Sequence, residues 1–274
     1  MEPLKGVKVC IIRVGGTNCD AETRRALLDV GLDCEVLHLN RVARQGLEGY
    51  GALILPGGFS YGDYVRAGAI WARRLISKLD KDLKGFLEDE KPILGICNGF
   101  QVLVEAGLLP SFDGPGNPIE RGPQAVLATN EPPGYRCRWV RLRVEDSRCI
   151  FTRGVPRGSI LRVPVAHSEG RFAFPKEREG EYLEKLIKGG QLVLRYCLED
   201  GSPAHGKYPY NPNGSLYDIA GICDPSGRVF GLMPHPERAY YGWQLPDWTK
   251  AGTPPPYGDG RLLFLALRSY LEKG

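Results

Sequence analysis

The chain of 274 residues is 42% hydrophobic and 25% charged, which is typical of a globular protein that buries a full core. Its formal net charge is +4, and no basic stripe interleaves with aromatic residues, which argues against a nucleic-acid-binding surface. No apolar run approaches the roughly 18–20 residues of a membrane span, and the chain does not start with the pattern of a signal peptide. We therefore expect a protein that binds neither nucleic acid nor membrane.

The first part of the chain alternates apolar strands with amphipathic helices. Strands are expected at 7–14, 34–39, 52–55 and 92–96, and helices at 21–30, at about 70–87 and from residue 100 to 106. Asp20 is placed to cap the first helix, while Gly31 and Gly107 are placed to end the first and third. Because the strands are almost wholly apolar, they indicate a parallel sheet that is covered by helices on both faces.

The second half is richer in β-structure. Residues 138–144 alternate apolar residues with arginines, a pattern typical of antiparallel pairing. Further strands are expected at 160–165, 191–197, 216–223 and 228–233, a last helix at about 260–272, and loop at 110–134, where Gly and Pro dominate. The predicted fold class is α/β, a flavodoxin-like three-layer α/β/α arrangement. Its central sheet is mainly parallel, with additional antiparallel strands in the second half.

Eight cysteines are spread along the chain, with no Cys-x-x-Cys pair and no histidine at zinc-finger spacing. A chain of this length does not need disulfides for stability. The pattern predicts a reduced, cytoplasmic protein without structural zinc.

One cysteine stands out by its position. Cys97 lies between Gly95 and Gly99 at a predicted junction of strand and helix, which is the pattern of a nucleophile elbow. The glycines allow a tight turn that exposes the side chain between them, and the start of the helix favours the thiolate. The alternative is a buried structural cysteine.

A cysteine nucleophile needs a base and a group that orients the base. Of four histidines, His38 falls in a predicted strand and His205 in a loop, whereas His235 follows the strand at 228–233 and precedes Glu237 by two residues. In extended backbone these two side chains point the same way, so the carboxylate can orient the imidazole. From spacing alone, an exposed surface pair remains an equal alternative.

Acyl transfer also needs N–H donors for the developing oxyanion. Gly57 and Gly58 end the strand at 52–55, and the N–H of Asn98 directly follows the candidate nucleophile. An ordinary strand-ending turn is the alternative for the two glycines.

Taken together, these segments resemble the class I (triad) glutamine amidotransferases, which have the nucleophilic Cys before a His-x-Glu pair. Several motifs resemble one branch in particular, the glutaminase subunits of the purine-pathway enzyme that makes formylglycinamidine ribonucleotide. These motifs are GTNCD (16–20), FSYGDY (59–64), RAGA (66–69), CNGFQ (97–101), NPNGS (211–215) and PHPERA (234–239).

The resemblance implies glutamine hydrolysis through a Cys97 thioester. Gly58 and Asn98 would hold the oxyanion, and His235, oriented by Glu237, would protonate the departing ammonia and later activate water. Gln101 would bind the glutamine substrate, together with the backbone from Ser168 to Gly170.

The resemblance also implies a partner. Ammonia would pass to a separate synthetase subunit that activates the formylglycinamide ribonucleotide amide with ATP and Mg²⁺. No phosphate loop is present, so we expect no cofactor and no metal in this chain. The need for a third small subunit is left open.

Two departures from the family pattern concern Gly15, where the family commonly has Pro, and the long interval between Cys97 and His235. We interpret residues 1–274 as a single amidotransferase domain with loop extensions near 110–135 and 240–257. Two other functions remain as alternatives: a different cysteine hydrolase on a flavodoxin-like fold, such as a peptidase or deglycase, or a catalytically silent regulatory subunit.

Overall fold

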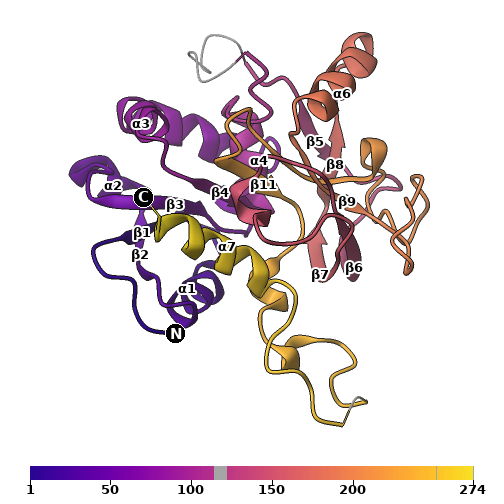
Figure 1. Cartoon of the computed structure of the whole chain (residues 1–274). Helices are drawn as coiled ribbons and strands as arrows, with labels where there is room; N and C mark the ends of the chain where they lie inside the picture. The colour runs from indigo at the N-terminus through magenta and orange to yellow at the C-terminus, as the bar shows by residue number, and fades with distance from the viewer. Residues whose placement is uncertain (114–121, 251, 274) are drawn as a thin grey trace.

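A computed structural model describes residues 1–113, 122–250 and 252–273 of the chain (Figure 1). Within them a mixed sheet has nine strands in the order β2-β1-β3-β4-β11-β10-β9-β6-β7, and β5 and β8 form a second, two-stranded sheet. The strands are β1 Lys8–Arg13, β2 Asp33–His38, β3 Tyr50–Leu55, β4 Ile93–Ile96, β5 Val126–Thr129, β6 Arg136–Val144, β7 Ile160–His167, β8 Glu169–Ala173, β9 Leu192–Tyr196, β10 Ile219–Cys223 and β11 Val229–Leu232.

The sheet divides into a parallel and an antiparallel half. Strands β2, β1, β3, β4 and β11 pair in parallel, in a register that sets Leu53 beside Ile93 and Leu232 beside Ile96. Strands β10, β9, β6 and β7 continue the sheet with antiparallel pairs. Because β4 and β11 are neighbours, the residues that follow them, Cys97 and His235, leave the sheet at the same edge.

Helices cover both faces of the sheet. Helix α1 contacts α7 on one face, and α3 contacts α4 on the other, giving the predicted three layers (Figure 1). The α-helices are α1 Asp20–Asp29, α2 Leu39–Gln45, α3 Ala69–Glu88, α4 Asn98–Glu105, α6 Glu179–Lys188 and α7 Arg261–Leu271. The fold class predicted from the sequence is confirmed.

Some details of the predicted elements were wrong. Asp20 is the first residue of α1 rather than its cap; Cys19 occupies the cap position and makes no side-chain capping bond. The stretch 110–134 is not all loop, because β5 forms there by pairing with β8. Residues 216–218 form a 3₁₀ turn ahead of β10 rather than its first residues.

The two-stranded sheet of β5 and β8 packs against α4. Phe172 of β8 stacks against Phe100 of α4 at 6.4 Å between ring centroids, and both rings are buried. Pairing with β8 therefore lets Val126–Thr129 form a strand despite Gly- and Pro-rich neighbours. Part of the predicted extension at 110–135, residues 114–121, lies outside the described residues.

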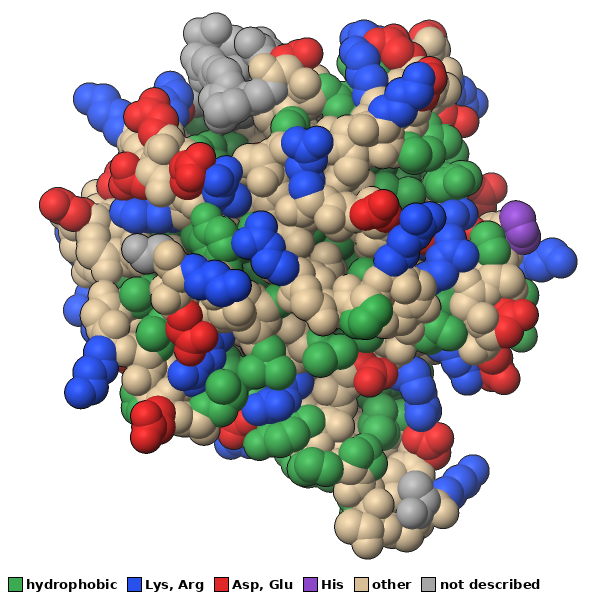
Figure 2. Space-filling view, in the orientation of Figure 1, with side chains coloured by type: hydrophobic (Ala, Val, Ile, Leu, Met, Phe, Trp, Pro, Cys, Tyr) green, Lys and Arg blue, Asp and Glu red, His purple; other side chains and the backbone are tan. Residues whose placement is uncertain are grey.

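The surface agrees with the composition. On the face shown in Figure 2, acidic and basic side chains are interspersed, and neither sign forms a continuous stripe. In the described part of the chain, no helix is both long enough and apolar enough to cross a membrane.

Candidate active site

The predicted nucleophile elbow is present. Cys97 lies between β4 and α4 with φ +50° and ψ −103°, a strained conformation for a residue with a side chain. A Cβ at Gly95 would lie 2.6 Å from the carbonyl oxygen of Gly99, and one at Gly99 would collide with the carbonyl oxygen of Leu55. Both glycines are therefore required by close backbone packing around the turn.

The Cys97 thiol lies in a closed site. Cys97 is 4% exposed, its N–H donates to the carbonyl of Leu232 at 2.8 Å, and its Sγ lies 3.7 Å from the carbonyl oxygen of Ala166. The elbow is thus held against the start of the His235 loop on one side and the end of β7 on the other.

His235 and Glu237 form a buried pair rather than the alternative exposed one. Nδ1 of His235 and Oε1 of Glu237 are 2.6 Å apart, and the two side chains are 2% and 0% exposed. Pro236 starts a 3₁₀ turn, η5 (Pro236–Ala239), so the backbone is not extended as predicted. The turn still brings the carboxylate back to the imidazole, and the N–H of His235 donates to the carbonyl of Pro164 at 2.8 Å.

The charges around His235 favour its protonated form. Burial on its own disfavours the imidazolium and lowers the pKa, but the charge of Glu237, followed by that of Cys97, outweighs this effect. The pKa of His235 is therefore raised well above its usual value. A thiolate beside an imidazolium is the arrangement that nucleophilic cysteine chemistry uses.

A second cysteine, Cys19, also contacts the imidazole. Its Sγ lies 3.8 Å from Nδ1 of His235, and its N–H donates to the carbonyl of Gly57 at 3.1 Å. Burial, as the largest cause, raises the pKa of Cys19, so this thiol stays protonated at neutral pH. Cys19 belongs to the motif at 16–20, but no spacing rule connects it to a histidine 216 residues later.

The candidate oxyanion donors lie where they were predicted, in the loop after β3 and at the start of α4. Gly58 has φ +153°, and a Cβ there would lie 2.7 Å from backbone atoms of Thr17 and Asn18, so only glycine fits. Among the described residues, neither the N–H of Gly58 nor that of Asn98 has a hydrogen-bond partner. Both donors are free to bind a developing oxyanion.

Gln101 and the 168–170 segment come together beside the elbow. The Gln101 amide donates to the carbonyl of Glu169, and its oxygen accepts from Nδ2 of Asn98 at 2.8 Å. The N–H of Gly170 donates to Asn130 at 3.0 Å and its carbonyl accepts from Asn213 at 2.8 Å. The structure thus shows Gln101 and Gly170 making contacts within the protein; their predicted contact with glutamine, like that of Ser168, stays a prediction.

His167 supports this segment. Its Nδ1 lies 3.1 Å from Oδ1 of Asn130, and a Cβ at Gly170 would collide with its ring. Burial lowers the pKa of His167 to about 3, so the ring is neutral. Asn130, whose Nδ2 also donates to the carbonyls of His167 and Gly134, was missed, because a polar residue in a Gly- and Pro-rich stretch looks like loop.

The remaining histidines and cysteines lie elsewhere. His38 is exposed and accepts from the N–H of Asn40 at the start of α2, and His205 is exposed in a loop. All eight cysteines are free, as predicted, and only Cys137 is exposed.

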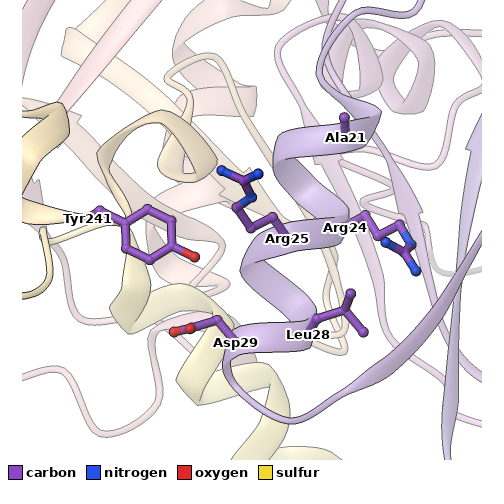
Figure 3. A pocket seen from close by; sticks show the side chains of 6 residues that line it. All are labelled: Ala21, Arg24, Arg25, Leu28, Asp29 and Tyr241. Atoms are coloured by element: carbon purple, nitrogen blue, oxygen red, sulfur yellow. The ribbon is translucent and has the colours of Figure 1, made fainter.

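A separate pocket of about 520 Å³ lies on the outer face of α1. Figure 3 shows Tyr241 facing Arg25 and Asp29 across it, with Ala21, Arg24 and Leu28 completing the lining. None of the candidate site residues lines this pocket.

Comparison with known proteins agrees with this site. The CobB/CobQ-like glutamine amidotransferase domain matches residues 6–271. A phosphoribosylformylglycinamidine synthase subunit PurQ from Archaeoglobus fulgidus is 44% identical, over 97% of this chain and 98% of that relative. The chain belongs to the PurQ family of glutamine amidotransferases.

Further relatives of the PurQ family extend the match over the whole fold. PurQ from Methanothrix thermoacetophila is 40% identical, over 97% of this chain and 99% of the relative. A chain in the structure of PurLQS from Thermotoga maritima superposes with a TM-score of 0.70 at 33% identity, over 99% of this chain and 100% of that one. The family assignment made from the sequence motifs is confirmed.

Proposed function

We propose that this chain is the glutaminase subunit of phosphoribosylformylglycinamidine synthase, acting in de novo purine synthesis in the cytoplasm as one domain spanning residues 1–274. The single observation that carries the chemistry is the buried hydrogen bond of 2.6 Å between His235 and Glu237. This pair lies on the loop after β11, and β11 pairs with β4, the strand that leads into Cys97. An exposed pair or a structural cysteine would not require this arrangement. Membership of the PurQ family also removes the alternative of an unrelated cysteine hydrolase.

In the first half of the reaction, the Cys97 thiolate attacks the side-chain carboxamide carbon of glutamine. The N–H groups of Gly58 and Asn98 stabilise the oxyanion of the tetrahedral intermediate. The imidazolium of His235 gives its proton to the nitrogen, the carbon–nitrogen bond breaks, and ammonia leaves behind a thioester.

In the second half, neutral His235 takes a proton from water, which attacks the thioester. The carbon–sulfur bond breaks, glutamate leaves, and the thiolate and imidazolium are restored. Glu237 holds the ring in one tautomer and stabilises its charge in both halves. We propose that Gln101 and the Ser168–Gly170 segment bind the glutamine substrate.

The ammonia is used by a partner subunit. We place ATP and Mg²⁺ on a separate synthetase subunit, which converts formylglycinamide ribonucleotide to formylglycinamidine ribonucleotide. Relatives named as subunits of this synthase, and a neighbour solved as PurLQS, support a complex with such a subunit.

The deciding experiment uses the complex reconstituted with the synthetase subunit and supplied with either glutamine or ammonia. Cys97→Ala is expected to abolish glutamine-dependent synthesis while ammonia-dependent synthesis continues. Cys137→Ala, which removes the exposed thiol, is the matched control and should leave both reactions intact. Loss of both reactions in Cys97→Ala, or of neither, would contradict the proposal, and full activity would identify a silent subunit.

A further inference from the structure

The proposed reaction gives no role to the buried thiol that lies against His235. Cys19 is 1% exposed at the start of α1, and its thiol contacts the catalytic imidazole from the side that Glu237 occupies, at Nδ1. No step of the hydrolysis above uses this sulfur. A thiol, an imidazole and a carboxylate therefore meet at one buried point.

The three groups have the spacing of metal ligands. Cys19, His235 and Glu237 each offer one possible ligand atom, and these three atoms lie within 4.8 Å of one another. A tetrahedral zinc ion with bonds of about 2.0–2.3 Å holds its ligand atoms roughly 3.3–3.8 Å apart. The separation of 3.8 Å between Sγ and Nδ1 already fits, and one carboxylate oxygen of Glu237 lies within 4.8 Å of both atoms, so a small shift of that side chain completes the set.

A second observation points to a ligand at this place. The other oxygen of Glu237, Oε2, is buried and has no hydrogen-bond partner among the described residues. A buried carboxylate oxygen without a partner is costly, and a bound cation would satisfy it.

Backbone hydrogen bonds fix the positions of Cys19 and His235. Cys19 is held by its N–H bond to Gly57, and a Cβ at Gly57 would lie 2.6 Å from Cε1 of His235 and 3.2 Å from the Cys19 sulfur. His235 is held by its N–H bond to the carbonyl of Pro164. Because two of the three ligands are fixed before any ion arrives, little ordering is required on binding.

We propose that Cys19, His235 and Glu237 form an inhibitory site for one Zn²⁺ ion. The donor set of one thiolate, one imidazole and one carboxylate suits zinc and leaves the fourth coordination position open. Zinc here is a regulator and takes no part in the reaction. The inhibitory part of this proposal rests on the proposed function, whereas the binding part does not.

Zinc bound at Nδ1 stops the chemistry in a defined way. On binding, the thiol proton of Cys19 and the Nδ1 proton of His235 are released to solvent. The only remaining ring proton is then at Nε2, so the imidazole cannot accept a proton from Cys97 or from water. Glu237, now a zinc ligand, no longer orients the ring.

The binding test uses cobalt, which replaces zinc and gives a thiolate-to-metal absorption band. The full chain should bind one Co²⁺ with this band, and excess Zn²⁺ should remove it. Cys97→Ser should retain the band, whereas Cys19→Ser should lose it, with zinc affinity falling by about 100-fold or more. Cys137→Ser is the control for the exposed thiol and should behave like the unchanged chain.

The opposite pattern, with the band lost in Cys97→Ser and kept in Cys19→Ser, would place the ion between the nucleophile and the histidine and overturn the proposal. Absence of any band in the unchanged chain would also overturn it. Glu237→Gln removes a different ligand and should weaken zinc binding as well, which keeps the test decisive if Cys19→Ser fails to fold.

The activity test uses the reconstituted complex. Zn²⁺ should abolish glutamine-dependent synthesis, a chelator should restore it, and ammonia-dependent synthesis should continue. Cobalt binding with no loss of glutamine-dependent synthesis would overturn the inhibitory role. Failure of the proposed function itself would appear separately, in the Cys97→Ala experiment without added metal.

Discussion

Nδ1 of His235 donates to Oε1 of Glu237 across 2.6 Å, with a single proline between the two residues. The proline starts the short turn η5, which folds the carboxylate back onto the ring. Both side chains are buried, so little water screens the interaction. The imidazolium is therefore stabilised mainly by one neighbouring group.

Removing the charge of Glu237 tests this dependence. Glu237→Gln keeps the shape of the side chain, and we expect kcat for glutamine-dependent synthesis to fall by about 10²–10⁴-fold. Because Glu237 raises the pKa of His235, its loss lowers that pKa, so His235 loses its proton at a lower pH. The alkaline limb of the kcat/KM profile should move to lower pH.

The matched control is Glu181→Gln on α6, where the carboxylate is exposed and pairs with Arg178 and Lys185. It should leave both the rate and the pH profile unchanged. An unshifted profile in Glu237→Gln would show that the carboxylate does not set the charge of His235.

The candidate triad was predictable because its chemistry is local in sequence. Gly95 and Gly99 flank the nucleophile, and Glu237 follows His235 by two residues, so spacing alone made both groups candidates and left an exposed pair as an equal alternative for the second. The meeting of the two groups depends on β4 pairing with β11, which spacing could not predict; the family resemblance implied only that the two groups act together.

The features that the sequence could not predict depend mainly on contacts between segments that are far apart in the chain. Cys19 reaches His235, and Asn130 reaches His167, through side chains that no periodicity connects. Helix α6 was missed although Tyr182 and Leu186 are spaced for one buried face, because charged residues surround them. The strand β5 forms only because β8 is there to pair with it.

Gly57 is predicted to determine the position of the imidazole. A Cβ at this residue would lie 2.6 Å from Cε1 of His235, so Gly57→Ala has to displace the ring or the loop. We expect kcat to fall by about 100-fold, since a shift of about 1 Å in a catalytic group has that effect. Ammonia-dependent synthesis should be unaffected.

Gly15→Ala is the matched control, because a Cβ there meets no atom within 4 Å. It should keep full activity with glutamine. Equal rates in the two variants would mean that the loop after β3 adapts freely and does not position His235.

The closed site predicts that the chain depends on its partner. Cys97 is 4% exposed, and its sulfur lies 3.7 Å from the carbonyl of Ala166, so glutamine needs an opening beside β7. We expect the isolated chain to release little glutamate, and the rate to rise when the synthetase subunit and its nucleotide are added. Equal glutamate release with and without the partner would contradict this coupling.

Stability against acid is predicted to depend on His167. Burial lowers its pKa to about 3 in the folded protein, whereas an unfolded histidine titrates near 6.5. Between these values the unfolded chain binds a proton that the folded chain does not, so stability present above pH 6.5 is lost as the pH falls. This residue alone should lower the free energy of unfolding by about 1.4 kcal/mol between pH 7.5 and pH 5.5.

His167→Asn removes the titrating group and keeps an amide nitrogen that can donate to Oδ1 of Asn130, the contact made by Nδ1 in the native chain. The variant should be less stable at neutral pH, because a smaller side chain leaves space beside Gly170. Its unfolding free energy should nevertheless fall less steeply with acid than that of the native chain. Urea unfolding at both pH values measures this, with His38→Asn, an exposed histidine, as the control. Parallel pH dependence in the native and His167→Asn chains would show that His167 takes up its proton while folded.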